Sequence, residues 1–84
     1  MNLLVIGGGS WGTALTFILS NKNKVNWWVR REKLANQIKN KKRNTKYLTN
    51  CILNLKNIAI TTNLETALKS CDLIIVAVPS SFIE

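Results

Sequence analysis

Residues 2–12 read NLLVIGGGSWG, a short β-prone run that leads directly into three consecutive glycines. The run Asn2–Ile6 is typical of a buried strand in a parallel sheet. From Trp11 onward, apolar residues recur every three or four positions, which predicts the buried face of a helix that ends in the polar stretch Ser20–Lys24. The members of that predicted face are Trp11, Ala14, Leu15, Ile18 and Leu19. The stretch therefore predicts a strand, a glycine turn and a helix in immediate succession.

The glycines of this turn match the pattern G-x-G-x-x-G, from Gly7 to Gly12, between strand and helix, where dinucleotide-binding folds carry it. Gly7 would allow the tight turn, and Gly12 would let the helix pack close to the strand. Gly9 would let the backbone approach a pyrophosphate, in a turn where a positive φ is also expected. The positive dipole end of the helix would face the phosphates. We interpret the loop as a dinucleotide phosphate site rather than a ligand-free turn.

The spacing from Gly7 to Gly12 also fits the glycines of a P-loop. A nucleoside triphosphatase needs Lys and then Ser or Thr after the second glycine, to hold the phosphates and magnesium. Thr13 and Ala14 stand at those positions. The sequence therefore disfavours triphosphate hydrolysis.

The remainder of the chain continues the alternation of strands and helices. The expected elements are a strand at Val25–Val29, a basic surface helix at Arg31–Lys42, an irregular connection at Arg43–Leu55, a strand at Ile58–Thr61, a helix with Leu64, Ala67, Leu68 and Cys71 on its apolar face, and a strand at Asp72–Val78 ended by Pro79. Thr62 and Glu65 fit a capping box for the third helix. Because strands joined through helices run parallel, we expect an α/β, doubly wound (Rossmann-type) half-domain with strand order 3-2-1-4.

Length and composition place the chain among small globular domains. Its 84 residues are 46% hydrophobic and 19% charged, which disfavours disorder. The longest apolar run, Leu73–Val78, is too short for a membrane span, and no secretory signal is evident at Met1, so we expect a cytoplasmic protein. Cys51 and Cys71, without any histidine, indicate reduced thiols rather than a metal site, with Cys71 packed as a small hydrophobe.

The net charge of +8 is concentrated between Lys22 and Lys46. Three interpretations stay open: a lysine- and asparagine-rich surface without a specific partner, a contribution to phosphate binding, and binding of nucleic acid. The last is the least favoured, because no groove-binding helix or stacking aromatics accompany the basic run.

The end of the second strand bears on the choice of cofactor. Sites that prefer NAD place an acidic residue there to accept from the ribose 2′-OH. Arg30 and Arg31 stand in this region, and the nearest acid is Glu32. Because two guanidiniums attract a 2′-phosphate, the sequence favours NADP or tolerance of both cofactors, although either arginine could instead be a solvated helix start.

Several segments together resemble the N-terminal part of the NAD(P)-dependent glycerol-3-phosphate dehydrogenase family. VIGGGSWGTAL (5–15) resembles the opening motif, whose Ser/Asn-Trp-Gly is far more specific than the glycines alone. The others are WWVRRE (27–32), Arg43-Asn44 with Tyr47-Leu48, the run from Leu53 to Thr61, and VAVPSSFI (76–83). The resemblance covers essentially all 84 residues in register. It implies NAD or NADP as cofactor and the interconversion of sn-glycerol 3-phosphate and dihydroxyacetone phosphate by hydride transfer, the entry to phospholipid synthesis.

The resemblance also implies cofactor contacts, position by position. Ser10 and Trp11 lie along the pyrophosphate together with Gly7, Gly8, Gly9 and Gly12. Arg30 matches a position near the adenosine end, and Arg31 is its neighbour. Tyr47 is close to the cofactor in some members, and Phe82 matches an aromatic that flanks the dinucleotide. For Trp11 and Phe82 the alternative is packing in the core.

This chain departs from the family pattern in two ways. Turn prolines are missing at Leu48-Thr49-Asn50 and at Leu53-Asn54, which costs loop rigidity rather than function. The chain is also short, so we expect residues 1–84 to be an incomplete dinucleotide-binding domain without the substrate domain, and no residue here is a predicted catalyst. The substrate would bind only with the absent region, and the last strand is an expected site of self-association. The alternative is a non-catalytic module for a nucleotide or RNA, or the product of a degraded gene.

Overall fold

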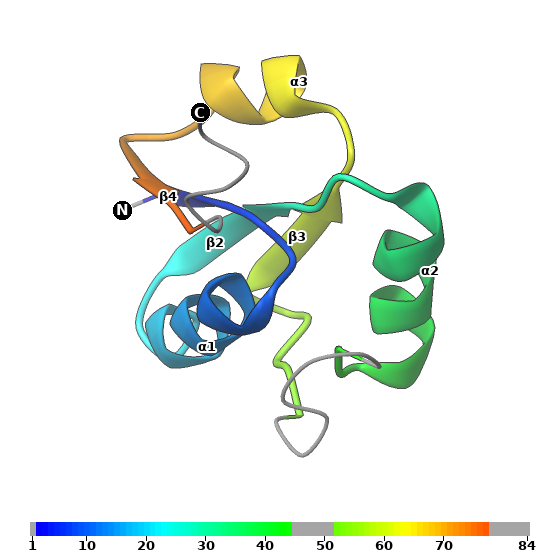
Figure 1. Cartoon of the computed structure of the whole chain (residues 1–84). Helices are drawn as coiled ribbons and strands as arrows, with labels where there is room; N and C mark the ends of the chain where they lie inside the picture. Colours follow the sequence, from blue (N-terminus) through cyan, green and yellow to red (C-terminus); the bar gives the residue numbers. More distant parts are fainter. Residues whose placement is uncertain (1, 45–51, 78–84) are drawn as a thin grey trace.

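Strands and helices alternate throughout the computed structural model, which describes residues 2–44 and 52–77 (Figure 1). The elements are β1 (Asn2–Ile6), α1 (Ser10–Leu19), β2 (Lys24–Trp28), α2 (Glu32–Lys41), β3 (Ile58–Thr61), α3 (Leu64–Lys69) and β4 (Leu73–Val76). Their order and type are those that the sequence predicts. Among the described residues, no helix is long and apolar enough to cross a membrane.

The four strands form one parallel sheet in the order β3-β2-β1-β4, as predicted. Helices α1 and α2 lie on one side of the sheet, and α3 lies on the other (Figure 1). This change of side accompanies the step from β3, at one edge, across to β4, at the opposite edge. Because the strands are parallel, the carboxyl ends of all four lie side by side. We call this side of the sheet its carboxyl edge and the opposite side its amino edge.

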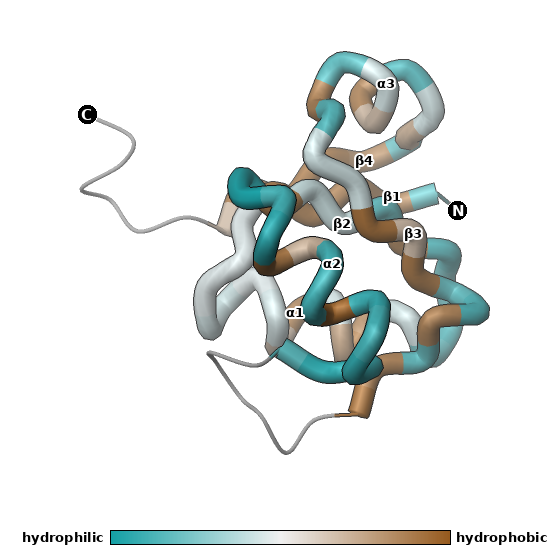
Figure 2. Tube along the Cα trace, turned by 90° about the vertical axis from the view of Figure 1, so that its right-hand side faces the viewer, coloured by the Kyte–Doolittle hydropathy of each residue, from teal (hydrophilic) through white to brown (hydrophobic). Residues whose placement is uncertain are grey.

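The main core lies between the sheet and the pair α1 and α2. Inward side chains alternate along the strands, as a sheet with one face on a core requires. They include Val5, Val25, Trp27, Ile58 and Ile60, and α2 adds Ala35 and Ile38. Figure 2 shows α2 as mostly hydrophilic, with single hydrophobic positions that recur along it. The helix is therefore held by a narrow apolar stripe.

The opposite face of the sheet and β4 are less covered. Helix α3 has six residues, and Ala67 is its buried one. Exposed fractions on β4 reach 51% at Leu73, 45% at Ile74 and 59% at Val76. The described sheet thus ends at an edge strand with apolar side chains in contact with solvent.

The predicted apolar face of α1 is wrong at two positions. Trp11 and Ile18 are 74% and 60% exposed, whereas Thr13 and Thr16 are fully buried. Close approach of this helix to the sheet leaves room for small side chains on its inner face and none for an indole. Leu15 and Leu19 do pack against the core.

The predicted capping box at Thr62 is also wrong. Asn63 is the N-cap of α3, and its side-chain oxygen accepts from the N–H of Thr66 at 3.1 Å. The hydroxyl of Thr61 accepts from the N–H of Asn63 at 2.9 Å, so the turn is shifted by one residue from the predicted one. An asparagine in this position caps a helix by the same chemistry as threonine.

Some predicted helix and strand boundaries differ from the structure. Strand β2 begins and ends one residue before the predicted range, and α2 is one residue shorter at each end. Lys42 ends α2 in the left-handed conformation, with φ of 58°.

Cys71 is only half-buried, and its Sγ lies 3.4 Å from the carbonyl oxygen of Leu68, so it is not a packed core residue. Pro79, the predicted end of the last strand, lies outside the described residues.

The cap of α3 can be tested by paired alanine variants. We expect Asn63→Ala to lower the free energy of unfolding by about 1 kcal/mol, because the N–H of Thr66 loses its acceptor. Thr62→Ala is the matched control and should change stability by less than about 0.5 kcal/mol. Urea denaturation of the purified chain measures both. A larger loss for Thr62→Ala than for Asn63→Ala would restore the capping box.

Candidate functional site

The loop of residues 7–12 lies at the carboxyl edge of the sheet, between the end of β1 and the start of α1. Strand β1 has β2 on one side and β4 on the other, so the strand order reverses beside this loop. Ligands of open α/β sheets bind at such a reversal, outside the carboxyl ends of the strands. The predicted phosphate loop is therefore placed where the fold can use it.

Two of the motif glycines are required by the fold itself. Gly7 has φ of 130°, a conformation that side chains disfavour, and its N–H donates to the carbonyl of Trp28 at 3.0 Å. A Cβ on Gly12 would lie 1.9 Å from the carbonyl oxygen of Gly7. Only glycine at position 12 lets α1 begin this close to the end of β1, as the sequence predicts.

Gly9 is different, because the protein itself leaves room for a side chain there. A Cβ at this position would meet no atom within 4 Å. Its φ of −82° and ψ of −164° suit any residue, so the expectation of a positive φ at Gly9 is wrong and that property belongs to Gly7. The space in front of Gly9 is open at the N-terminus of a helix, and a dinucleotide pyrophosphate fits such a position.

The start of α1 is suited to an anion. Gly9 is the N-cap and supplies no side-chain acceptor, and the first turn contains no acidic residue. Ser10 and Trp11 are both exposed, so packing in the core does not account for Trp11 in the described structure. The unpaired N–H groups and the helix dipole make this end electropositive.

Arg30 and Arg31 follow β2 at the same edge of the sheet, and both are exposed. Arg31 is the N-cap residue of α2, and its carbonyl accepts from the N–H of Ala35 at 3.1 Å. Neither guanidinium has a side-chain partner within residues 2–44 and 52–77. Tyr47 and Phe82, the other two predicted cofactor residues, lie outside the described residues.

Asn44 also belongs to this site, although the sequence analysis predicted no role for it. It is fully buried, and its Nδ2 donates to the carbonyl of Gly8 at 3.0 Å and to the hydroxyl of Thr13 at 2.8 Å. The Thr13 hydroxyl donates to the carbonyl of Gly9 at 2.8 Å. A buried asparagine in an irregular connection has no periodic signal, and only its place beside Arg43 in the family-like segment singled it out.

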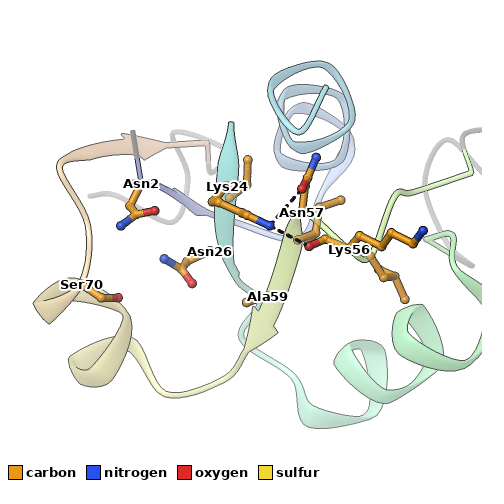
Figure 3. A pocket seen from close by; sticks show the side chains of 10 residues that line it. Asn2, Lys24, Asn26, Lys56, Asn57, Ala59 and Ser70 are labelled. Carbon is orange, nitrogen blue, oxygen red and sulfur yellow. Dashed lines mark hydrogen bonds between the residues drawn. The ribbon is translucent and has the colours of Figure 1, made fainter. Parts of the chain in front are cut away.

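An open groove of about 400 Å³ lies at the opposite, amino edge of the sheet (Figure 3). Its lining includes Asn2, Lys24, Asn26, Lys56, Asn57, Ala59 and Ser70. The ammonium of Lys24 is already bound to the carbonyl of Lys56 and to the Asn57 side chain, at 3.3 and 3.2 Å. None of the predicted cofactor residues lies in this groove.

Within the described ranges there is also no group of three or more His, Cys, Asp or Glu residues that could hold a metal.

Comparison with known proteins agrees with this geometry. Residues 2–84 match the family model described as NAD-dependent glycerol-3-phosphate dehydrogenase N-terminus. The chain is 44% identical over 82 residues to glycerol-3-phosphate dehydrogenase [NAD(P)+] of Bacillus pumilus, which covers 96% of this chain and 24% of that protein. It is 46% identical over 80 residues to the protein of the same name from Rickettsia bellii, covering 94% and 25%.

A solved structure is similar in fold and sequence. The crystal structure of glycerol-3-phosphate dehydrogenase from Coxiella burnetii matches with a TM-score of 0.85 and 29% identity, over 94% of this chain and 24% of that one. The chain thus spans about a quarter of the length of the proteins that it matches.

Proposed function

The chain belongs to the NAD-dependent glycerol-3-phosphate dehydrogenase family, whose N-terminal domain it matches, and we propose that it is the part of such an enzyme that binds NAD or NADP. The proposed reaction of the whole enzyme is the interconversion of sn-glycerol 3-phosphate and dihydroxyacetone phosphate in glycerophospholipid synthesis. When bound, the dinucleotide supplies the hydride chemistry, and the protein supplies binding and orientation.

The observation that carries this proposal is the environment of Gly9. The fold explains Gly7 by its φ and Gly12 by its contact with a carbonyl, but nothing in the described protein requires glycine at position 9. A residue without a side chain, beside the open start of a helix, leaves room for a bulky anion to reach the backbone. Along the pyrophosphate we propose Gly7, Gly8, Gly9, Ser10, Trp11 and Gly12.

The remaining proposed contacts are with the adenosine end and the rings of the cofactor. Arg30 and Arg31 are exposed at the carboxyl end of β2, on the same edge as the loop, which suits a ribose or its 2′-phosphate. Tyr47 and Phe82 stay proposals that rest on the family resemblance. We propose no catalytic residue in this chain, and the substrate would be held together with regions beyond these 84 residues. A cytoplasmic location is likewise proposed.

The phosphate site can be tested at Gly9. We expect Gly9→Val to weaken binding of NADPH more than ten-fold, or about 1.4 kcal/mol, because its methyl groups occupy the space in front of the loop. Fluorescence titration measures affinity, and urea denaturation should give an unchanged midpoint. Gly12→Ala is the contrast: its Cβ meets the Gly7 carbonyl, so stability itself should fall. Unchanged NADPH affinity in folded Gly9→Val would show that this loop is not the phosphate site.

The arginine pair predicts the cofactor preference. We expect NADPH to bind at least as tightly as NADH, with NADPH binding weakened more by salt because its extra attraction is electrostatic. Arg30→Asp should shift the preference toward NADH, and Lys56→Asp, which makes the same charge change at the opposite edge, should not. Titration of both cofactors at low and high salt measures this. A clear preference of the parent chain for NADH at low salt would contradict the assignment.

Strand β4 is the proposed site of self-association. Its apolar side chains at Leu73, Ile74 and Val76 are about half exposed, beside an edge that can pair with another strand. We expect light scattering of the purified chain to give a mass above that of a monomer. Ile74→Lys should reduce this mass, because a charged side chain on an edge strand opposes pairing. A monodisperse parent monomer would rule the proposal out.

A further inference from the structure

The carbonyl groups of the first three loop residues, Gly7, Gly8 and Gly9, all accept hydrogen bonds from within the protein. The Gly7 carbonyl accepts from the indole Nε1 of Trp27 at 2.7 Å, and the Gly8 carbonyl accepts from Asn44 Nδ2 at 3.0 Å. The Gly9 carbonyl accepts from both the N–H and the hydroxyl of Thr13, at 3.0 and 2.8 Å. Three successive acceptors thus have donors from three different parts of the chain.

The loop N–H groups have the opposite arrangement. For residues 8 to 12, no acceptor is found among residues 2–44 and 52–77. A carbonyl oxygen carries partial negative charge and repels phosphate, whereas an N–H attracts it. With its carbonyls held inside, the loop offers donors to a ligand and keeps its acceptors away. The polarity of the site therefore depends on the groups that hold the carbonyls.

Asn44 and Thr13 form one connected unit among these groups. A side-chain amide has two N–H donors, and those of Asn44 are directed to the Gly8 carbonyl and to the Thr13 hydroxyl. The hydroxyl proton of Thr13 is then directed to the Gly9 carbonyl. The reversed amide would place Oδ1 against the carbonyl oxygen of Gly8, so only one orientation is favourable. Both side chains are fully buried, where such bonds are strong and their loss is costly.

We propose that Asn44, acting through Thr13, is the positioning residue that fixes the polarity of the pyrophosphate loop. This inference rests on the proposed function, and it assigns a role in affinity to a residue that is fully buried behind the loop. Trp27 holds the Gly7 carbonyl in the same way, but its ring also fills the core, so its removal would not separate the two effects.

The test compares NADPH dissociation constants among variants of the full 84-residue chain, measured by fluorescence. We expect Asn44→Leu and Thr13→Val each to weaken binding about ten-fold. Asn44→Leu removes the donor of the Gly8 carbonyl, and Thr13→Val removes the hydroxyl that joins Asn44 to the Gly9 carbonyl, which keeps only the backbone N–H of residue 13. Thr13→Ser keeps the hydroxyl and should bind within about two-fold of the parent chain. The double variant should bind about as weakly as the weaker single variant, because the two residues act as one unit.

Asn57→Ala is the matched control. The Asn57 Nδ2 also donates to a backbone carbonyl, that of Ser20 at 2.8 Å, but at the amino edge of the sheet. We expect this variant to lose stability and keep its NADPH affinity. Equal weakening in Asn57→Ala and Asn44→Leu would overturn the inference.

The remaining outcomes separate the inference from the proposed function. If the parent chain binds NADPH and folded Thr13→Val binds equally well, the positioning role is wrong while the cofactor site stands. Thr13→Val replaces a hydroxyl by a methyl group of similar size, so this comparison holds even where Asn44→Leu does not fold. If the parent chain binds no NADPH, the proposed function fails and this inference fails with it.

Discussion

The arrangement of this domain depends on one close contact, between the Cα of Gly12 and the carbonyl of Gly7. Because a Cβ at position 12 would lie 1.9 Å from that oxygen, only glycine lets α1 start directly against the end of β1. The same carbonyl accepts from the Trp27 indole, which ties the turn to β2 and to the centre of the core. Strand, turn, helix and neighbouring strand are thus joined at a single backbone group.

The glycines of the loop have separate physical roles. Gly7 provides a backbone conformation and Gly12 provides a close approach, so both are explained within the protein. At Gly9, nothing in the described residues requires glycine. The motif therefore divides into two positions that the fold requires and one, Gly9, that we propose serves the ligand, so substitutions at them should affect different quantities.

The two faces of the sheet are supported unequally. The face toward α1 and α2 contains the connected apolar core, whereas the other face has the six-residue α3 and ends at the exposed β4. The candidate site lies at the carboxyl edge, at the junction of β1, β2 and the helices of the well-packed face. Its geometry is consequently supported by the part of the domain with the most buried contacts, as a preorganised site requires.

The sequence by itself determined the order of elements, the parallel sheet, its strand order and the place of the glycine loop between β1 and α1. These follow from local patterns: β-prone runs, helical spacing and glycines at a strand end. The sequence pattern placed the cap of α3 one residue too early, at Thr62 instead of Asn63. It also predicted that Trp11 and Ile18 are buried, because periodicity does not tell which face of a helix the sheet can approach. Only the tertiary structure decided that Thr13 and Thr16 face inward, that Gly7 rather than Gly9 has the positive φ, and that Asn44 holds the loop. Each of these depends on atoms that are distant in sequence and meet only when the chain is folded.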